Sequence, residues 1–469
     1  MGSAHALTSR AVLFAFTADL IPLYALYALL FAAHGLSAAQ ISSLFAIWSA
    51  TSFLLEIPSG AWADTVSRRG LLILSGALLA GGFLAWTLYP SYLGFAAGFV
   101  LWGASGALRS GTFEALIYDD LADRAATRSY PRLMGYTRAA AESAALAGIL
   151  AAAPLYAWGG FPLVAGSSVA VAVLHTFAAT LLPSAPKAVS AADVEDLEEG
   201  GEGADSEDTC GHSGVLSAGI HRDGVDPGQK HAGMTSEDAG MTGVASGYWV
   251  MLRTGLREAL HVRMIRRGVV LVALLNGMTA FDEYFALLAD HAGAGPALAA
   301  VLVGVTVAGS LAGSLLAGRT EGMRNRAMAV ALAVAGVLFI GGSLLAGSAA
   351  YHPAALYVLT AVGFSAVGIA YGIDYNADVI ASARLQDAIT GPARATVTSV
   401  SGFVTEVIAL LVFGFAALAS TWLPIPVMVA LLGVPLLLTA ALIPTWLPRR
   451  GRGLTSAVSE SSSGAPDAR

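Results

Sequence analysis

The chain has 469 residues, of which 56% are hydrophobic and only 12% are charged. An average soluble domain carries about 25% charged residues, so this chain has too few polar side chains to cover its apolar ones in water. The composition excludes a soluble globular enzyme, a nucleic-acid-binding protein and a disordered scaffold. The single cysteine, Cys210, excludes an intramolecular disulfide framework and a cysteine-built metal centre.

The apolar residues are arranged in runs long enough to cross a bilayer, which takes about 20 residues of helix. The polar alternation typical of barrel strands is missing. The sequence therefore predicts an all-α membrane protein with twelve transmembrane helices, near residues 11–33, 38–59, 70–89, 92–119, 134–156, 161–182, 267–289, 296–317, 327–347, 354–380, 395–418 and 425–447. The first run is longer than a typical signal-peptide core and has no clear small-residue cleavage site, so we interpret it as a retained helix.

Basic residues are distributed in a pattern that predicts orientation. Of the 25 Lys and Arg residues, all except Arg109 and Arg138 lie at the termini, in the central segment or in every second connection. Because basic connections remain on the cytoplasmic side, we expect a multi-pass protein of the cell (inner or plasma) membrane. Both termini and the central segment are then cytoplasmic.

The central segment differs from the rest of the chain because it is acidic, rich in Gly and Ser, and poor in apolar residues. Such a segment buries too little surface to fold alone. It predicts disorder over 184–245, with a short amphipathic helix near 247–262 on the membrane surface. The predicted domains are an N-terminal six-helix bundle (1–183), a cytoplasmic linker (184–262), a C-terminal six-helix bundle (263–450) and a disordered cytoplasmic tail (451–469).

The two halves on either side of the linker share features at a common offset of roughly 260 residues, which is typical of transporters built from repeats. Gly60 with Arg68 falls on Gly318 with Arg324, and Glu114 falls near Asp374. We therefore expect two pseudo-symmetric bundles around a central cavity.

A ten-residue motif, Gly60-Ala61-Trp62-Ala63-Asp64-Thr65-Val66-Ser67-Arg68-Arg69, stands between the second and third predicted helices. It suits a tight cytoplasmic turn. Gly60 allows close helix approach, Asp64 can accept hydrogen bonds from helix N-terminal amides or pair with Arg, and Arg68 and Arg69 can anchor the chain at the headgroups.

This motif resembles the loop signature of the major facilitator superfamily, Gly-x-x-x-Asp-x-x-Gly-Arg-Arg/Lys, with Ser67 in place of the usual glycine. The segments Glu56-Ile57-Pro58-Ser59 and Glu114-Ala115-Leu116-Ile117-Tyr118-Asp119 are similar to those of a bacterial subgroup of drug or small-molecule exporters. The resemblance implies two six-helix bundles, a central cavity and alternating access.

Several charges fall inside the predicted helices, where each costs about 2.5–3.5 kcal/mol on insertion scales. The candidates for proton coupling or for lining the cavity are Asp19, Arg109, Glu114, Arg138, Glu142, Asp282, Glu283, Asp374 and Glu406. Arg138 and Glu142 are four residues apart and can pair, whereas Arg109 and Glu114 are five apart, ~140° around one helix.

A low-dielectric cavity favours a neutral carboxylic acid, and a nearby Arg favours the charged carboxylate. Moving such an Arg would therefore switch a proton on or off. Asp19 and Glu406 are the leading candidates, because both are deep and neither has a basic partner nearby in the sequence. The alternative is that these charges form fixed bridges that hold the bundles together.

Possible substrate contacts are Tyr24, Trp48, Trp102 and Asn276. The two tryptophans lie in the middle of helices, where they either stack on a substrate or pack the bundle interior. The histidines of the linker are irregularly spaced and predict no metal site, and we expect no cofactor.

The chain has no Walker A loop, no His-Glu-x-x-His and no Gly-x-Ser-x-Gly, so we expect neither an enzyme nor an ATP-driven pump. The sequence favours a secondary active transporter that moves a small molecule by alternating access, through proton-coupled efflux of an amphipathic drug or metabolite. Proton-coupled uptake of a nutrient or siderophore and a transport-dead receptor or scaffold are the alternatives. The expected partners are the small-molecule substrate, protons and the lipid bilayer, with no nucleic acid, and the expected state is a monomer.

Overall fold

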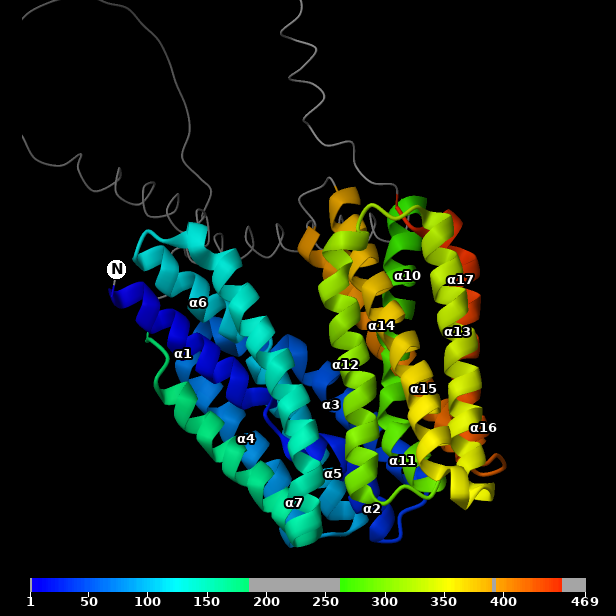
Figure 1. Cartoon of the computed structure of the whole chain (residues 1–469). Coiled ribbons are helices and arrows are strands. Elements are labelled where there is room, and N and C mark those ends of the chain that lie inside the picture. The colour runs from blue at the N-terminus through cyan, green and yellow to red at the C-terminus, as the bar shows by residue number, and fades with distance from the viewer. Residues whose placement is uncertain (1, 185–261, 390–393, 449–469) are drawn as a thin grey trace, which may run out of the picture.

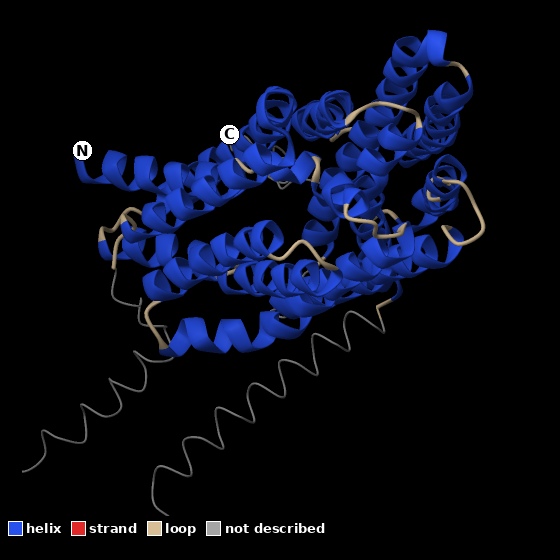
Figure 2. Cartoon of the chain, turned by 90° about the horizontal axis from the view of Figure 1, so that it is seen from below, coloured by secondary structure: helices blue, strands red, loops and turns tan. Residues whose placement is uncertain are grey.

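The computed structural model describes residues 2–184, 262–389 and 394–448, and every regular element in these ranges is a helix (Figure 2). This follows from the composition, because a helix satisfies all its backbone groups internally, as a lipid environment requires. The predicted disordered linker, nearly all of the predicted amphipathic helix near 247–262 and the tail 451–469 lie outside the described residues.

The helices of the first described range pack mainly on one another. They are α1 (Gly2–Asp19), η1 (Pro22–Ala25), α2 (Tyr27–Ala33), α3 (Ala38–Thr65), α4 (Arg68–Leu88), α5 (Tyr92–Arg109), α6 (Thr112–Asp123), η2 (Thr127–Ser129) and α7 (Tyr130–Thr180). We call them the N-set.

The helices of the remaining ranges also pack mainly on one another and form the C-set. They are α10 (Arg263–Met278), η3 (Thr279–Tyr284), α11 (Phe285–His291), α12 (Pro296–Thr320), α13 (Asn325–Ser348), η4 (Ala349–Tyr351), η5 (Pro353–Ala355), α14 (Leu356–Ala388), α15 (Arg394–Ala419), α16 (Ile425–Leu431) and α17 (Val434–Trp446).

Several predicted helices are interrupted. The run 11–33 breaks after Asp19, because Pro22 opens a 3₁₀ turn and cannot donate a helical hydrogen bond. The run 92–119 divides between α5 and α6, since Gly111 has a φ of 71°, a left-handed conformation that glycine adopts without a steric penalty. The prediction of one continuous α-helix is therefore wrong in both places, although Ala6–Ala33 is still a single candidate membrane span.

The predicted runs 134–156 and 161–182 belong to one long element, α7, which kinks at Gly159 and Gly160. Ten segments of the described residues are long and apolar enough to cross a membrane; α7 counts once among them, and α5 is not one of the ten. The structure thus supports a membrane-embedded, all-helical protein, whereas the twelve helices in two bundles are not confirmed and stay a prediction.

The two sets meet through α3 with α15, α7 with α12 and α2 with α11. Figure 1 shows that the two sets lie close together at the end where α2 and α11 are found. They lie apart at the opposite end, where α6 and the start of α10 are found. The helices of the two sets therefore diverge from one end of the molecule to the other.

Candidate functional site

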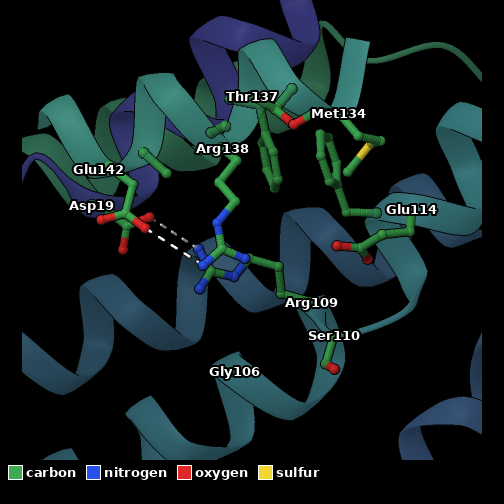
Figure 3. A pocket seen from close by; sticks show the side chains of 13 residues that line it. Asp19, Gly106, Arg109, Ser110, Glu114, Met134, Thr137, Arg138 and Glu142 are labelled. Atoms are coloured by element: carbon green, nitrogen blue, oxygen red, sulfur yellow. Dashed lines mark hydrogen bonds and ion pairs between the residues drawn. The ribbon is translucent and has the colours of Figure 1, made fainter. Parts of the chain in front are cut away.

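A charged cavity of about 570 Å³ lies within the N-set, among α1, α5, α6 and α7. Figure 3 shows the side chains that give it its polarity. Its charged lining residues are Asp19, Arg109, Glu114, Arg138 and Glu142. Five of the nine charged candidates from the sequence are thus brought together in one place.

Two ion pairs of similar length lie in this cavity, with Asp19 and Glu142 next to each other (Figure 3). Nη1 of Arg109 lies 3.8 Å from Oδ2 of Asp19, and Nη2 of Arg138 lies 3.7 Å from Oε1 of Glu142. Both distances are longer than the hydrogen-bond range of about 2.7–3.2 Å, so the groups attract one another without being locked in one geometry. The Arg138–Glu142 pair is the one predicted from the sequence, whereas a partner for Asp19 was not foreseen.

Arg109 and Glu114 reach this cavity from two different helices. The expectation that they lie ~140° apart on one helix is wrong, because the helix is interrupted at Ser110 and Gly111, between α5 and α6. The exposed Glu114 lies in the first turn of α6, where a carboxylate is stabilised by the helix dipole.

A second cavity, of about 260 Å³, lies between the two sets. Its lining comes from α3, from α10 with η3, and from α15, and includes Trp48, Asn276, Asp282, Glu283 and Glu406. A neighbouring cavity of about 410 Å³ shares Asn276 and Glu406 and adds Glu56. We call these two adjacent spaces the inter-set cavity.

The carboxylates of the inter-set cavity have neutral partners or none. Ser49 Oγ donates to Glu406 Oε2 at 2.5 Å, which joins α3 of the N-set to α15 of the C-set. Tyr371 Oη donates to Asp282 Oδ2 at 2.6 Å. The Glu283 side chain makes no hydrogen bond or ion pair within the described ranges, and no Lys or Arg appears among the described residues that line the cavity.

An aromatic stack stands behind one wall of the inter-set cavity. Trp48, which lines the cavity, stacks on Trp102 with ring centroids 5.0 Å apart, and Trp102 stacks on Tyr24 at 5.2 Å. Of the predicted substrate contacts, Trp48 and Asn276 line the cavity, while Tyr24 and Trp102 form the packing behind Trp48. The stack holds the Trp48 ring in one orientation.

Asp374 lies apart from both cavities. Its side chain is fully buried on α14, and neither carboxylate oxygen has a hydrogen-bond partner among the described residues. Asp378, one turn further along α14, interacts with Asn276 and lies 3.5 Å from the hydroxyl of Ser382.

The ten-residue motif forms less of a turn than its sequence suggests. Its residues from Gly60 to Thr65 belong to the last turns of α3, so the turn is confined to Val66 and Ser67. Ser67 caps α4 by accepting from the Gly70 amide at 3.3 Å, which gives serine a physical role at this position. Arg68 pairs with the largely buried Asp119 on α6.

Two residues of these networks, Ser49 and Tyr371, were not foreseen, and the prediction that Arg384 lies in a connection between helices is wrong, because it belongs to α14. Arg384 is 95% buried on α14 and donates to the carbonyl oxygens of Glu321 and Met323 and to Asn325 Oδ1 at 2.8–2.9 Å. A lone serine or tyrosine in an apolar helix carries no pattern that names its partner on another helix. Among the described residues, no three His, Cys, Asp or Glu side chains are grouped so as to hold a metal ion.

The family model of the Major Facilitator Superfamily matches residues 10–404 of the chain. Among solved structures, the nucleoside transporter NupG has a TM-score of 0.59 at 12% identity, covering 95% of this chain and 100% of its own. A D-xylose-proton symporter scores 0.58 at 14% identity, covering 94% and 97%. A POT family transporter in complex with 5-aminolevulinic acid scores 0.60 at 12% identity, covering 93% and 95%. A comparison with curated protein sequences found no match.

The chain therefore belongs to the Major Facilitator Superfamily, as its loop motif predicted. Membership supports secondary transport and points to a transporter rather than an enzyme. The solved structures, at these identities, show the fold alone.

Proposed function

We propose that this member of the Major Facilitator Superfamily is a proton-coupled exporter of small amphipathic molecules that works by alternating access between the N-set and the C-set. The inter-set cavity carries the proposal, because it is lined by both sets and because its acids Asp282, Glu283 and Glu406 lie within candidate membrane spans of the C-set. Charges at that depth are costly and are retained chiefly where they bind substrate or ions.

The lining of the inter-set cavity favours an amphipathic molecule with a positive charge. Asp282, Glu283 and Glu406 supply negative charge, and no basic side chain is found in the described lining to neutralise it. Trp48 offers an aromatic face next to these acids, a surface that attracts organic cations through its ring quadrupole. The combination suits a molecule with an apolar body and a cationic group.

The charged cavity of the N-set supplies the proposed coupling element. Its two ion pairs are loose, so a small movement of α5 or α7 relative to α1 changes which Arg lies nearest to Asp19. An Arg close to a carboxylate favours the charged form, and an Arg that moves away favours the protonated form. Glu406 is the second proposed proton carrier, because its hydrogen bond to Ser49 exists only while α3 and α15 touch.

Uptake is the second candidate function, since one protein of similar fold is described as a D-xylose-proton symporter. The two functions differ in the sign of the pH gradient that drives accumulation. Deleting residues 190–245 separates a third alternative: a transporter should largely keep transport, whereas a transport-dead receptor or scaffold that signals through the central segment should lose its function.

The test uses the purified full-length protein in proteoliposomes, with tetraphenylphosphonium as the probe cation and a pH-sensitive dye inside. We expect probe movement to drive opposite proton movement in the wild type, and Asp19→Asn and Glu406→Gln each to weaken this exchange. Asp290→Asn, on the exposed face of α11 outside both cavities, is the matched control. If both variants keep the wild-type rate and pH dependence, coupling through these residues is wrong.

A further inference from the structure

A third cavity, of about 650 Å³, opens at the end of the C-set and shares no lining residue with the inter-set cavity. It is lined by Arg263, Met264, Arg267, Asn325, Pro444, Thr445, Trp446, Leu447 and Pro448. These residues come from α10, the start of α13, and α17 with the residues that follow it. We call this space the basic end cavity.

The basic end cavity lies where three candidate membrane spans begin or end. Arg263 is the first residue of the span that includes α10, Asn325 is the first of the span that includes α13, and Trp446 is the last of the span that includes α17. Span ends lie at the level of the lipid headgroups, where tryptophan side chains are enriched. The cavity is therefore placed at the boundary between headgroups and acyl chains.

The charged side chains that line this cavity are all positive. Arg263 and Arg267 are four residues apart and share a face of α10, where two like charges repel by a few tenths of a kcal/mol. Neither arginine side chain has an ion pair or hydrogen bond within the described ranges, and the described lining holds no Asp or Glu. The first turn of α10 adds to the positive potential, because Val262 provides no side-chain cap.

The residues around the two arginines are held by hydrogen bonds in which the side chains of Arg263 and Arg267 take no part. Asn325 Nδ2 donates to the Leu447 carbonyl at 3.1 Å, which ties the start of α13 to the end of α17. Asn325 Oδ1 accepts from Arg384 Nη1 at 2.8 Å. The cavity is thus a built pocket with a rigid polar wall, and Met264, Trp446 and Leu447 give it an apolar side.

We propose that the basic end cavity binds the phosphate headgroup of an anionic phospholipid. Two guanidinium groups four residues apart suit the oxygens of a phosphodiester, which Arg binds through paired hydrogen bonds. The apolar side of the cavity suits the first carbons of the acyl chains. Basic pockets between membrane helices are a known physical arrangement for such headgroups. This site is independent of the proposed transport cavity.

The test is native mass spectrometry and thermal unfolding of the delipidated full-length protein with added phosphatidylglycerol, phosphatidylcholine or inorganic phosphate. We expect phosphatidylglycerol to bind and to raise the melting temperature, with phosphatidylcholine bound at least tenfold more weakly. The double variant Arg263→Gln/Arg267→Gln should lose at least tenfold in phosphatidylglycerol affinity. Arg128→Gln/Arg132→Gln, which removes two arginines at the same spacing near the start of α7, should bind like the wild type.

Equal binding of phosphatidylcholine and phosphatidylglycerol, or equal losses in the two double variants, would overturn the proposal. Inorganic phosphate that protects the wild type as strongly as phosphatidylglycerol would overturn the assignment to lipid and leave a site for free phosphate. Trp446→Leu provides a second variant, since it keeps both charges. It should weaken phosphatidylglycerol binding while leaving the response to inorganic phosphate unchanged.

Discussion

The hydrogen bond between Ser49 and Glu406 joins the two sets of helices, so its removal should change how often they separate. Ser49 lies on α3 and Glu406 on α15, and the 2.5 Å bond exists only while these helices are in contact. A hydrogen bond to a charged group contributes about 1.5–3 kcal/mol. Water that enters the cavity replaces part of this free energy. We therefore expect Ser49→Ala to change the ratio between the conformation with α3 and α15 in contact and the conformation with them apart by roughly tenfold, which corresponds to the lower end of that range.

Spin-label distances measure this shift directly. Because Cys210 is the single cysteine, Cys210→Ser gives a background for one label at the end of α6 and one just after the end of α12, which report on the end where the sets are apart (Figure 1). Releasing α3 from α15 should let that end close, so Ser49→Ala should increase the population with short distances. Ser143→Ala removes only a bond within α7 and should leave the distribution unchanged.

A double-mutant cycle tests the reasoning further. Ser49→Ala and Glu406→Ala should be non-additive, with a coupling energy of about 1.5 kcal/mol in the ratio of the two conformations. Unchanged distances in Ser49→Ala, or strictly additive effects in the cycle, would refute the idea that this bond controls contact between the sets.

Three further predictions concern stability and binding. An added side chain at Gly313 would overlap the backbone carbonyl of Gly372. Gly313→Leu should therefore lower the melting temperature by an amount equivalent to about 1–3 kcal/mol or more. The control Gly341→Leu should leave the melting temperature unchanged, because a side chain at Gly341 meets open space. Arg68→Gln should lower the free energy of unfolding by about 3 kcal/mol, because it leaves the largely buried Asp119 unpaired. The exchanged pair Arg68→Asp/Asp119→Arg should recover part of this stability. No recovery would argue against a pairwise interaction. Trp48→Leu should weaken tetraphenylphosphonium binding by about tenfold. Trp158→Leu, at a side chain that is 79% exposed, should have no effect. Equal losses in the two variants would rule out a specific aromatic contact.

Much of the candidate site was visible in the sequence because intramembrane charges are rare and costly. Asp19, Glu283 and Glu406 could be named without any structure, since each stands in an apolar run where a charge needs a reason. The pair of Arg138 and Glu142 followed from helical spacing alone. The same argument also selected Asp374, which the structure places away from both cavities.

The sequence by itself determined the membrane class, the positions of most apolar helices and the family, because hydrophobic runs and a local motif are properties of contiguous residues. Only the tertiary structure decided the partners: Arg109 beside Asp19, Ser49 on Glu406 and Tyr371 on Asp282 each join residues far apart in the chain. It also decided where helices break, since Gly111 and Gly160 look like any other glycine until their backbone angles are known. Spacing along one helix predicts which side chains share a face, but contact between helices depends on how those faces pack in three dimensions.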